Sequence, residues 1–207
     1  MDWGKKLEEL GVLWRMNYDN PSGAHALFTS GMHADGYCNC AKIVVDPAFT
    51  SQVAAAMIEK VVPKLNGVTP DFVIGPAYGA VTFAHEVAKQ LGVKFAFTEI
   101  DYTDEGKMQA LKRFDIPEGA KVLVIEDMKS TGGSAIKTIS VLEEAGIEVL
   151  PVVGLVGNWS GDETIGDKEV VSLFSEKLNI WEADECPLCK NGSEAVRPKG
   201  NWDKLAR

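Results

Sequence analysis

The feature that most constrains the fold of this chain is a run of four apolar residues, 122–125, that leads into two acids and then a Gly132-Gly133 turn. A continuous apolar run of this length is typical of a strand that is buried on both faces. After the turn, Ile136, Ile139, Val141 and Leu142 recur at helical spacing up to about residue 145. A buried strand that passes through a glycine turn directly into a helix indicates an α/β protein.

The same alternation extends over most of the chain and predicts a mostly parallel central sheet flanked by helices. Apolar and β-branched runs predict strands at residues 71–75, 94–98, 121–126 and 148–156. Helical spacing predicts helices at residues 47–62, 79–91 and 133–145. Two polar stretches, residues 99–111 and 157–168, separate core elements and are candidates for functional loops.

Composition excludes several classes of function. The 207 residues are 45% hydrophobic and 25% charged, which is ordinary for one globular domain. The net charge is −9 and no cluster of Lys and Arg is evident, so we expect no nucleic-acid partner. Apolar runs are too short to span a membrane, and the charged first ten residues do not resemble a signal peptide. We therefore expect a cytoplasmic protein.

The segment from residue 122 to residue 134 has the residue types of a sugar-phosphate site. Glycines allow a ligand to approach the backbone, and the hydroxyls of Ser130, Thr131 and Ser134 with the first N–H groups of the helix suit a phosphate. Carboxylates only accept hydrogen bonds, so Glu126 and Asp127 suit the vicinal hydroxyls of a ribose. The alternative is an ordinary capped turn after a strand that ends in acids. The segment matches neither a Walker A loop nor a GxGxxG dinucleotide site.

This segment resembles the motif by which type I phosphoribosyltransferases bind 5-phosphoribosyl pyrophosphate (PRPP). The resemblance implies that Glu126 and Asp127 hold the ribose hydroxyls and act in catalysis. It also implies that residues 129–134 wrap the 5-phosphate, and that Mg²⁺ is bound through PRPP. The PRPP-binding residues expected in this segment are Glu126, Asp127, Met128, Lys129, Ser130, Thr131, Gly132, Gly133 and Ser134.

Further segments are similar to the orotate phosphoribosyltransferase family, namely residues 27–37, 74–79, 97–99, 111–116, 181 and 185–189. The resemblance implies the type I phosphoribosyltransferase fold, with a core at about residues 46–175 and a small hood from about residues 1–45 and the C-terminal segment. It implies a homodimer that transfers the phosphoribosyl group of PRPP to orotate. The further contacts that we expect are Pro76, Ala77 and Tyr78 for PRPP, and Ser30, Tyr37, Ser130 and Asn158 for the base.

Three positions depart from the family pattern. Ile100 stands where the family usually has a lysine that meets the pyrophosphate, so we expect Lys107, from the same loop, as the catalytic cation. Asn158 follows Gly157 where the family has Asp-Arg, and an amide cannot pair with a carboxylate as arginine does. Thr29 occupies a position that can carry a lysine. A transferase for another base, such as a purine, and a PRPP-binding relative without turnover therefore stay as alternatives.

The remaining candidates are cysteines and histidines. Cys38 with Cys40, and Cys186 with Cys189, could together supply four thiolates to zinc, but nothing in the sequence brings the two pairs together, and we expect no metal held by the protein alone. His33 lies in the expected hood and could approach a ligand, whereas His25 and His85 carry no assignment.

Overall fold

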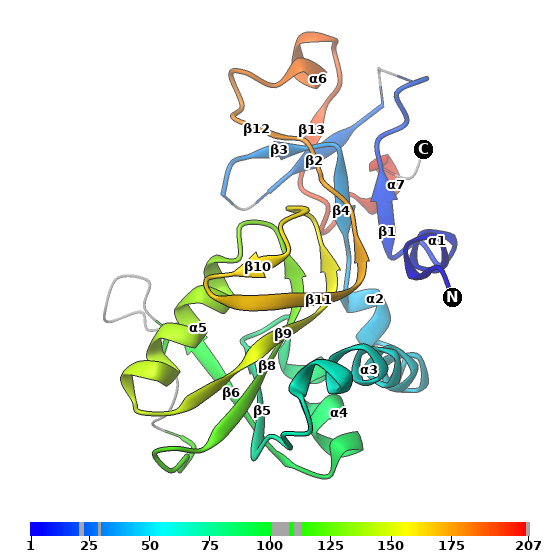
Figure 1. Ribbon diagram of the computed structural model, residues 1–207. Coiled ribbons are helices and arrows are strands. Elements are labelled where there is room, and N and C mark those ends of the chain that lie inside the picture. Colours follow the sequence, from blue (N-terminus) through cyan, green and yellow to red (C-terminus); the bar gives the residue numbers. More distant parts are fainter. Residues whose placement is uncertain (21–22, 29, 101–107, 110–112, 206–207) are drawn as a thin grey trace. The chain divides into compact units, whose positions relative to one another are not determined.

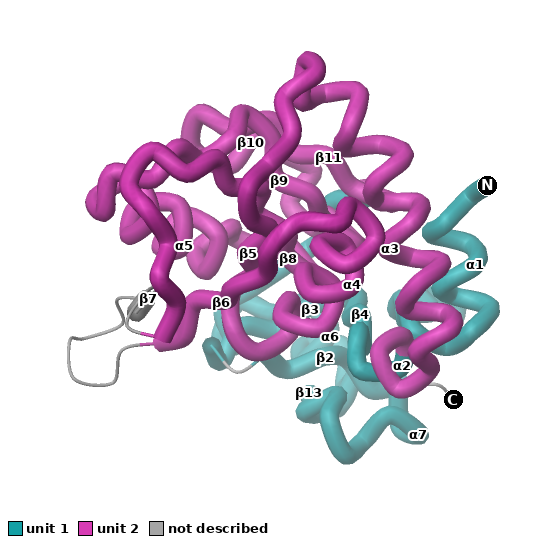
Figure 2. The backbone as a smooth tube through the Cα atoms, turned by 90° about the horizontal axis from the view of Figure 1, so that it is seen from below, with its two compact units in different colours: residues 1–42, 176–207 teal, residues 43–175 magenta. Residues whose placement is uncertain are grey.

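The structure is a computed structural model that describes residues 1–20, 23–28, 30–100, 108–109 and 113–205 (Figure 1). The described chain forms two compact units, residues 1–42 with 176–207 (unit 1) and residues 43–175 (unit 2), which Figure 2 distinguishes by colour. Among the described residues, no helix combines the length and the apolarity that a membrane span requires.

Unit 2 is built on a seven-stranded sheet in the order β10-β11-β9-β8-β5-β6-β7. The five central strands are parallel, and an antiparallel strand lies at each edge. The strands are β5 (Phe72–Pro76), β6 (Lys94–Ile100), β7 (Met108–Gln109), β8 (Lys121–Lys129), β9 (Glu148–Asn158), β10 (Thr164–Ile165) and β11 (Lys168–Ser175). This confirms the predicted α/β class with a mostly parallel sheet.

Helices cover both faces of this sheet. They are α3 (Pro47–Val61), which is followed by the 3₁₀ helix η1 (Val62–Leu65), α4 (Val81–Leu91) and α5 (Gly133–Glu144). Helices α3 and α4 contact one face, and α5 contacts the other (Figure 1). The reason is the right-handed crossover rule: β5–α4–β6 proceeds in one direction along the sheet and β8–α5–β9 in the opposite direction, so their helices lie on opposite faces.

The predicted central strand is the middle of the core, as its apolar run indicated. Residues 122–125 are each at most 1% exposed. Val122 and Val124 pack with Ile139 and Leu142 of α5. The end of the Ile125 side chain lies on the side of α3, because a Cβ placed on Gly154 would contact both Ile125 and Met57 of α3. Burial on both faces therefore accounts for the absence of polar alternation in this strand.

Several predicted details are wrong. Ile136 is 45% exposed, and the buried face of α5 is formed by Ala135, Thr138, Ile139 and Leu142. The predicted loop at residues 157–168 contains the short strand β10 and the end of β9. Helix α4 begins at Val81 rather than at residue 79, because residues 77–80 form a turn after β5.

Unit 1 consists of short elements around its own small core. A four-stranded sheet has the order β12-β3-β2-β13, and β1 pairs with β4. The elements are α1 (Trp3–Glu9), β1 (Leu13–Arg15), β2 (His25–Leu27), β3 (His33–Ala34), β4 (Gly36–Cys38), α2 (Ala41–Val44, which extends into unit 2), β12 (Ile180–Trp181), α6 (Pro187–Lys190), β13 (Ala195–Val196) and α7 (Trp202–Leu205). The sheet joins the N-terminal strands β2 and β3 to the C-terminal strands β13 and β12. Segments roughly 150 to 170 residues apart in the sequence are therefore neighbours in unit 1.

Candidate active site

The acid pair Glu126–Asp127 lies near the point in the sheet where the direction in which successive strands are added reverses. Strand β8 extends beyond the predicted end at residue 126 to Lys129, because it continues to pair with β9 up to Lys129 and Asn158. On its other side, the pairing with β5 ends at Ile74 and Val124. From β5 the chain proceeds to β6 on one side, and from β8 it proceeds to β9 and β11 on the other. Open α/β sheets bind their ligands at the carboxyl ends of strands at such a point.

The two acids differ strongly in environment. Glu126 is 4% exposed, and its carboxyl accepts hydrogen bonds from the Ser134 hydroxyl at 2.5 Å and the Asp127 amide at 3.1 Å. Burial first, and the neighbouring charge of Asp127 second, raise the pKa of Glu126 well above its ordinary value. Asp127 is only partly buried, and its Oδ1 accepts a hydrogen bond from the Met128 amide at 2.7 Å. Asp127 is therefore the member of the pair whose carboxylate is accessible to a ligand.

The loop after β5 meets this carboxylate. A Cβ placed on Gly79 would lie 2.2 Å from Oδ2 of Asp127 and 2.7 Å from its Cγ, so only glycine fits at position 79 beside this rotamer. In the same loop, Pro76 pairs with Thr98 of β6, the Ala77 amide donates to the Thr98 carbonyl at 2.6 Å, and the Ala77–Tyr78 peptide bond is cis. The structure thus brings together the two segments that were predicted separately as PRPP contacts.

The turn after β8 leads into α5 as predicted. Gly132 has φ +80°, a backbone conformation that residues other than glycine rarely adopt, and it directly precedes the first residue of α5. Thr131 Oγ1 accepts a hydrogen bond from the Gly133 amide at 3.4 Å, while Ser130 is exposed. The first N–H groups of a helix have no partner within the helix. Residues 130–134 therefore present amides and hydroxyls beside Asp127, which is an arrangement suited to a phosphate.

Two residues of the predicted site bond within the protein instead. Lys129 is 3% exposed, and its ammonium group donates to the Ser160 hydroxyl and to Asp162 Oδ2, the latter at 3.2 Å. Asn158 is 2% exposed, donates to the Asp162 carbonyl at 2.8 Å and accepts from Ser160. These two side chains hold residues 160–162 against the end of β8. A contact of Asn158 with a base would require these hydrogen bonds to be exchanged.

The other predicted residues have the following surroundings. Tyr78 is 79% exposed, and Met128 packs beside Gly157. The predicted base contacts Ser30 and Tyr37 lie in unit 1, where Ser30 accepts a hydrogen bond from the Met32 amide and Tyr37 packs between Phe28 and Trp202. Thr29 and the expected catalytic Lys107 lie outside the described residues, as does most of the candidate functional loop at residues 99–111.

Sequence reasoning missed the supporting residues of this site. Gly79 was seen in the loop motif, but the need for glycine there is evident only once Asp127 is placed beside it. Thr98 and Thr138 are fully buried and joined by a hydrogen bond of 2.8 Å between their hydroxyls, which connects β6 to α5. In the sequence, a threonine within a helical segment, such as Thr138, gives no sign that it has such a partner.

A phosphoribosyl transferase domain matches residues 44–189 of the chain. An orotate phosphoribosyltransferase of Thermoanaerobacter sp. (strain X514) is 39% identical over 196 residues, which cover 94% of this chain and 97% of the relative. The orotate phosphoribosyltransferase of Heliobacterium modesticaldum (strain ATCC 51547 / Ice1) is 37% identical over 177 residues, or 84% of this chain and 88% of that one.

Solved structures share the fold. The crystal structure of orotate phosphoribosyltransferase from Aeropyrum pernix has a TM-score of 0.66 at 22% identity and covers 83% of this chain and 92% of its own. The adenine phosphoribosyltransferase of Saccharomyces cerevisiae has a TM-score of 0.63 at 18% identity and covers 83% and 98%. At these identities the structural likeness shows the fold alone, and the two structures differ in the base that their names state.

Proposed function

Because this chain belongs to the orotate phosphoribosyltransferase family, we propose that it transfers the 5-phosphoribosyl group of PRPP to orotate, which yields orotidine 5-phosphate and pyrophosphate. The observation that carries this proposal is the meeting of Asp127 with the Gly79 loop directly before the Gly132 turn. The residues proposed to accept the ribose hydroxyls, to contact the leaving group and to bind the 5-phosphate are thereby adjacent. The choice of orotate rests on the names of relatives such as the one that is 39% identical over 94% of this chain.

The acid pair would hold the ribose. Asp127 Oδ1 accepts a hydrogen bond from the Met128 amide, and the partly exposed carboxylate of Asp127 would accept a ribose hydroxyl. Burial and the nearby charge of Asp127 raise the pKa of Glu126, which favours its neutral form and so less negative charge beside the incoming phosphates.

The 5-phosphate would lie in the turn of residues 130–134, where several charge-assisted hydrogen bonds act together. A single helix terminus contributes only about 0.3–1 kcal/mol per charge at an exposed site, so affinity depends on the amides and hydroxyls acting as a set. The bond between the sugar and pyrophosphate then loosens, the base nitrogen attacks from the opposite face, and no protein nucleophile is needed. The loop that contains Lys107 is proposed to close over the reaction and exclude water.

Magnesium fits this site through its donor chemistry. Mg²⁺ prefers oxygen ligands and retains several waters, and the Asp127 carboxylate is partly exposed and ready to meet a hydrated ion carried by PRPP. Buried Glu126, with its raised pKa, suits that role less well. When bound, the ion neutralises the departing pyrophosphate. We further propose that the enzyme is cytoplasmic and a homodimer. Light scattering on the purified chain would test the dimer.

The test is PRPP turnover with a panel of bases in the presence of Mg²⁺, measured as the release of pyrophosphate. We expect orotate consumption, a loss of at least about a hundredfold in kcat/KM for Asp127→Asn, and ordinary activity for Asp167→Asn on the surface. Turnover of a purine in place of orotate would establish the alternative base. Saturable PRPP binding without pyrophosphate release would establish a binding protein, and no binding at all would refute the assignment.

A further inference from the structure

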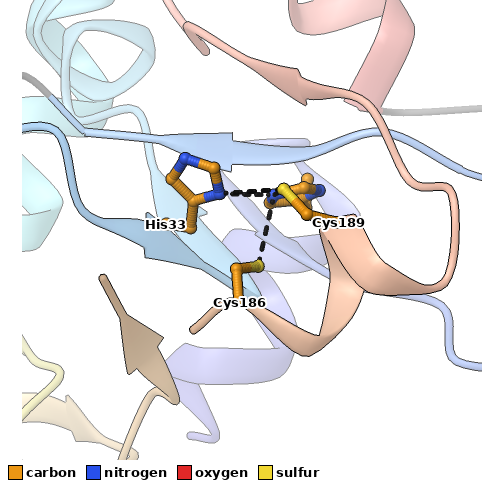
Figure 3. Close-up of side chains that lie close together, drawn as sticks. His33, Cys186 and Cys189 are labelled. Carbon is orange, nitrogen blue, oxygen red and sulfur yellow. Dashed lines mark hydrogen bonds between the residues drawn. The ribbon is translucent and has the colours of Figure 1, made fainter. Parts of the chain in front are cut away.

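Four side chains that the transferase site does not use converge in unit 1. His25 lies on β2. His33 lies on the paired strand β3, Cys186 directly precedes α6 and Cys189 lies within α6 (Figure 3). One possible ligand atom from each residue lies within 4.8 Å of all the others. Three of the residues are buried, at 0% exposure for His25 and Cys186 and 6% for His33, and Cys189 is partly exposed.

The distances match a tetrahedral zinc site. Nε2 of His25 lies 3.6 Å from both sulfurs, and Nδ1 of His33 lies 3.3 Å from the Cys189 sulfur and 2.9 Å from Nε2 of His25. With Zn–S of about 2.3 Å and Zn–N of about 2.0–2.1 Å, a tetrahedron places its ligand atoms roughly 3.3–3.8 Å apart. Four of the six separations between these ligand atoms therefore agree with a zinc tetrahedron to within a few tenths of an ångström, and all six are within 4.8 Å.

The hydrogen bonds around His25 select the ring form that a metal requires. The Ser193 hydroxyl donates its single hydrogen to the Gly23 carbonyl, which can only accept. Ser193 Oγ must then accept the hydrogen bond of 2.7 Å from His25 Nδ1, so Nδ1 carries the proton. Nε2 of His25 consequently presents its lone pair toward His33 and the two sulfurs. Metal-bound histidines are commonly held in this way by a partner on the second nitrogen.

We propose that His25 Nε2, His33 Nδ1 and the thiolates of Cys186 and Cys189 bind one Zn²⁺ ion in a closed, structural site. Two thiolates and two imidazoles in a tetrahedral arrangement are a donor set typical of zinc. All four positions are filled by the protein, so the site has no open position for catalysis. This corrects the four-thiolate hypothesis, since Cys38 and Cys40 lie outside the described cluster and form a separate pair with sulfurs 3.6 Å apart.

The location explains what the ion would do. Strands β2, β3, β12 and β13 contain only two or three residues each, which is too little ladder to hold a sheet firmly by itself. The two histidines come from the N-terminal part of unit 1 and the two cysteines from its C-terminal part. Zinc would join the two ends of the chain across this sheet and add its binding free energy to the folding of unit 1.

The experiment uses the full chain without a polyhistidine tag. Metal content by mass spectrometry is expected to give one zinc per chain for the wild type and for the matched control C38S/C40S. For C186S/C189S it is expected to give none. Zinc retained in C186S/C189S, or lost only in C38S/C40S, would overturn the assignment.

Cobalt substitution decides the outcome even where a variant fails to fold. Wild-type protein stripped by a chelator and loaded with Co²⁺ under reducing conditions is expected to show strong visible bands of a tetrahedral ion and a thiolate charge-transfer band. The melting temperature is expected to rise on addition of zinc to stripped protein. Stripped wild type that takes up neither ion at neutral pH would refute the proposal. PRPP turnover plays no part in these readouts, so the transferase assignment and the zinc site can fail separately.

Discussion

Replacing Gly79 by alanine tests whether the loop after β5 positions the carboxylate of Asp127. The new Cβ would lie 2.2 Å from Asp127 Oδ2 and 2.7 Å from Cγ, whereas real Cβ contacts essentially never fall below 3.0 Å. The carboxylate must therefore move by at least about 0.8 Å. Gly79 is itself exposed, and the Asp127 side chain can rotate, so the clash is relieved locally.

The expected magnitude follows from this displacement. A misplacement of about 1 Å in a reacting constellation costs about a hundredfold in rate, which corresponds to about 2.7 kcal/mol of transition-state stabilisation. We expect kcat/KM for PRPP to fall by about this factor in Gly79→Ala. The melting temperature should stay nearly unchanged, because alanine also reduces the entropy of the unfolded chain by an amount equivalent to about 0.4–1 kcal/mol.

The assay is a double-mutant cycle on pyrophosphate release. Asp127→Ala removes the carboxylate with which the new Cβ collides, so Gly79→Ala should add almost no further loss in that background. The same hundredfold loss in both backgrounds would refute the reasoning, since the methyl group would then act on something other than Asp127. A large drop in melting temperature for the single variant would refute it as well.

Three further predictions concern neighbouring residues. Because the pKa of Glu126 is raised in the folded state, the folded protein binds the Glu126 proton more tightly than the unfolded chain does. The protonated Glu126 therefore stabilises the fold below about pH 4.5, and this stabilisation is lost as pH rises through the folded pKa. Glu126→Gln should therefore become progressively more stable than the wild type in denaturant titrations as pH rises above 4.5, and a pH-independent difference would contradict this. Lys129→Met should destabilise the protein by about 1–3 kcal/mol through loss of its bonds to Ser160 and Asp162, and should speed hydrogen exchange at residues 158–162 rather than in α5. Ile100→Lys should raise kcat by at least about tenfold by supplying a cation to the pyrophosphate, and an unchanged kcat would show that position 100 does not face that group.

The parts of the fold that sequence reasoning predicted well depend on local patterns. The apolar run at residues 122–125 indicates β8, because a strand in the middle of a parallel sheet buries consecutive side chains on both faces. The helix after Gly132 followed from its spacing of apolar residues, although Ile136 is exposed and the buried face includes Thr138. Exact helix faces and strand ends were missed, because they depend on neighbours such as β9, which extends β8 to Lys129.

The candidate transferase site was predicted as segments and not as a geometry. The acids and the glycine turn are adjacent in sequence, so their joint role was evident from spacing alone. That Lys129 and Asn158 bond to residues 160–162 was not evident, because a lysine and an amide beside a phosphate motif also suit direct ligand contact. Burial separates these possibilities, and burial is a property of the packed chain.

By itself, the sequence determined the α/β class, the central strand and the turn that follows it, since propensity and hydrophobic period act over a few residues. Only the tertiary structure decided which distant residues meet. It placed Gly79 against Asp127, and it placed His25 and His33 beside Cys186 and Cys189 rather than beside Cys38 and Cys40. The physical reason is that such contacts arise from the order of strands and the packing of whole elements, which local periodicity does not encode.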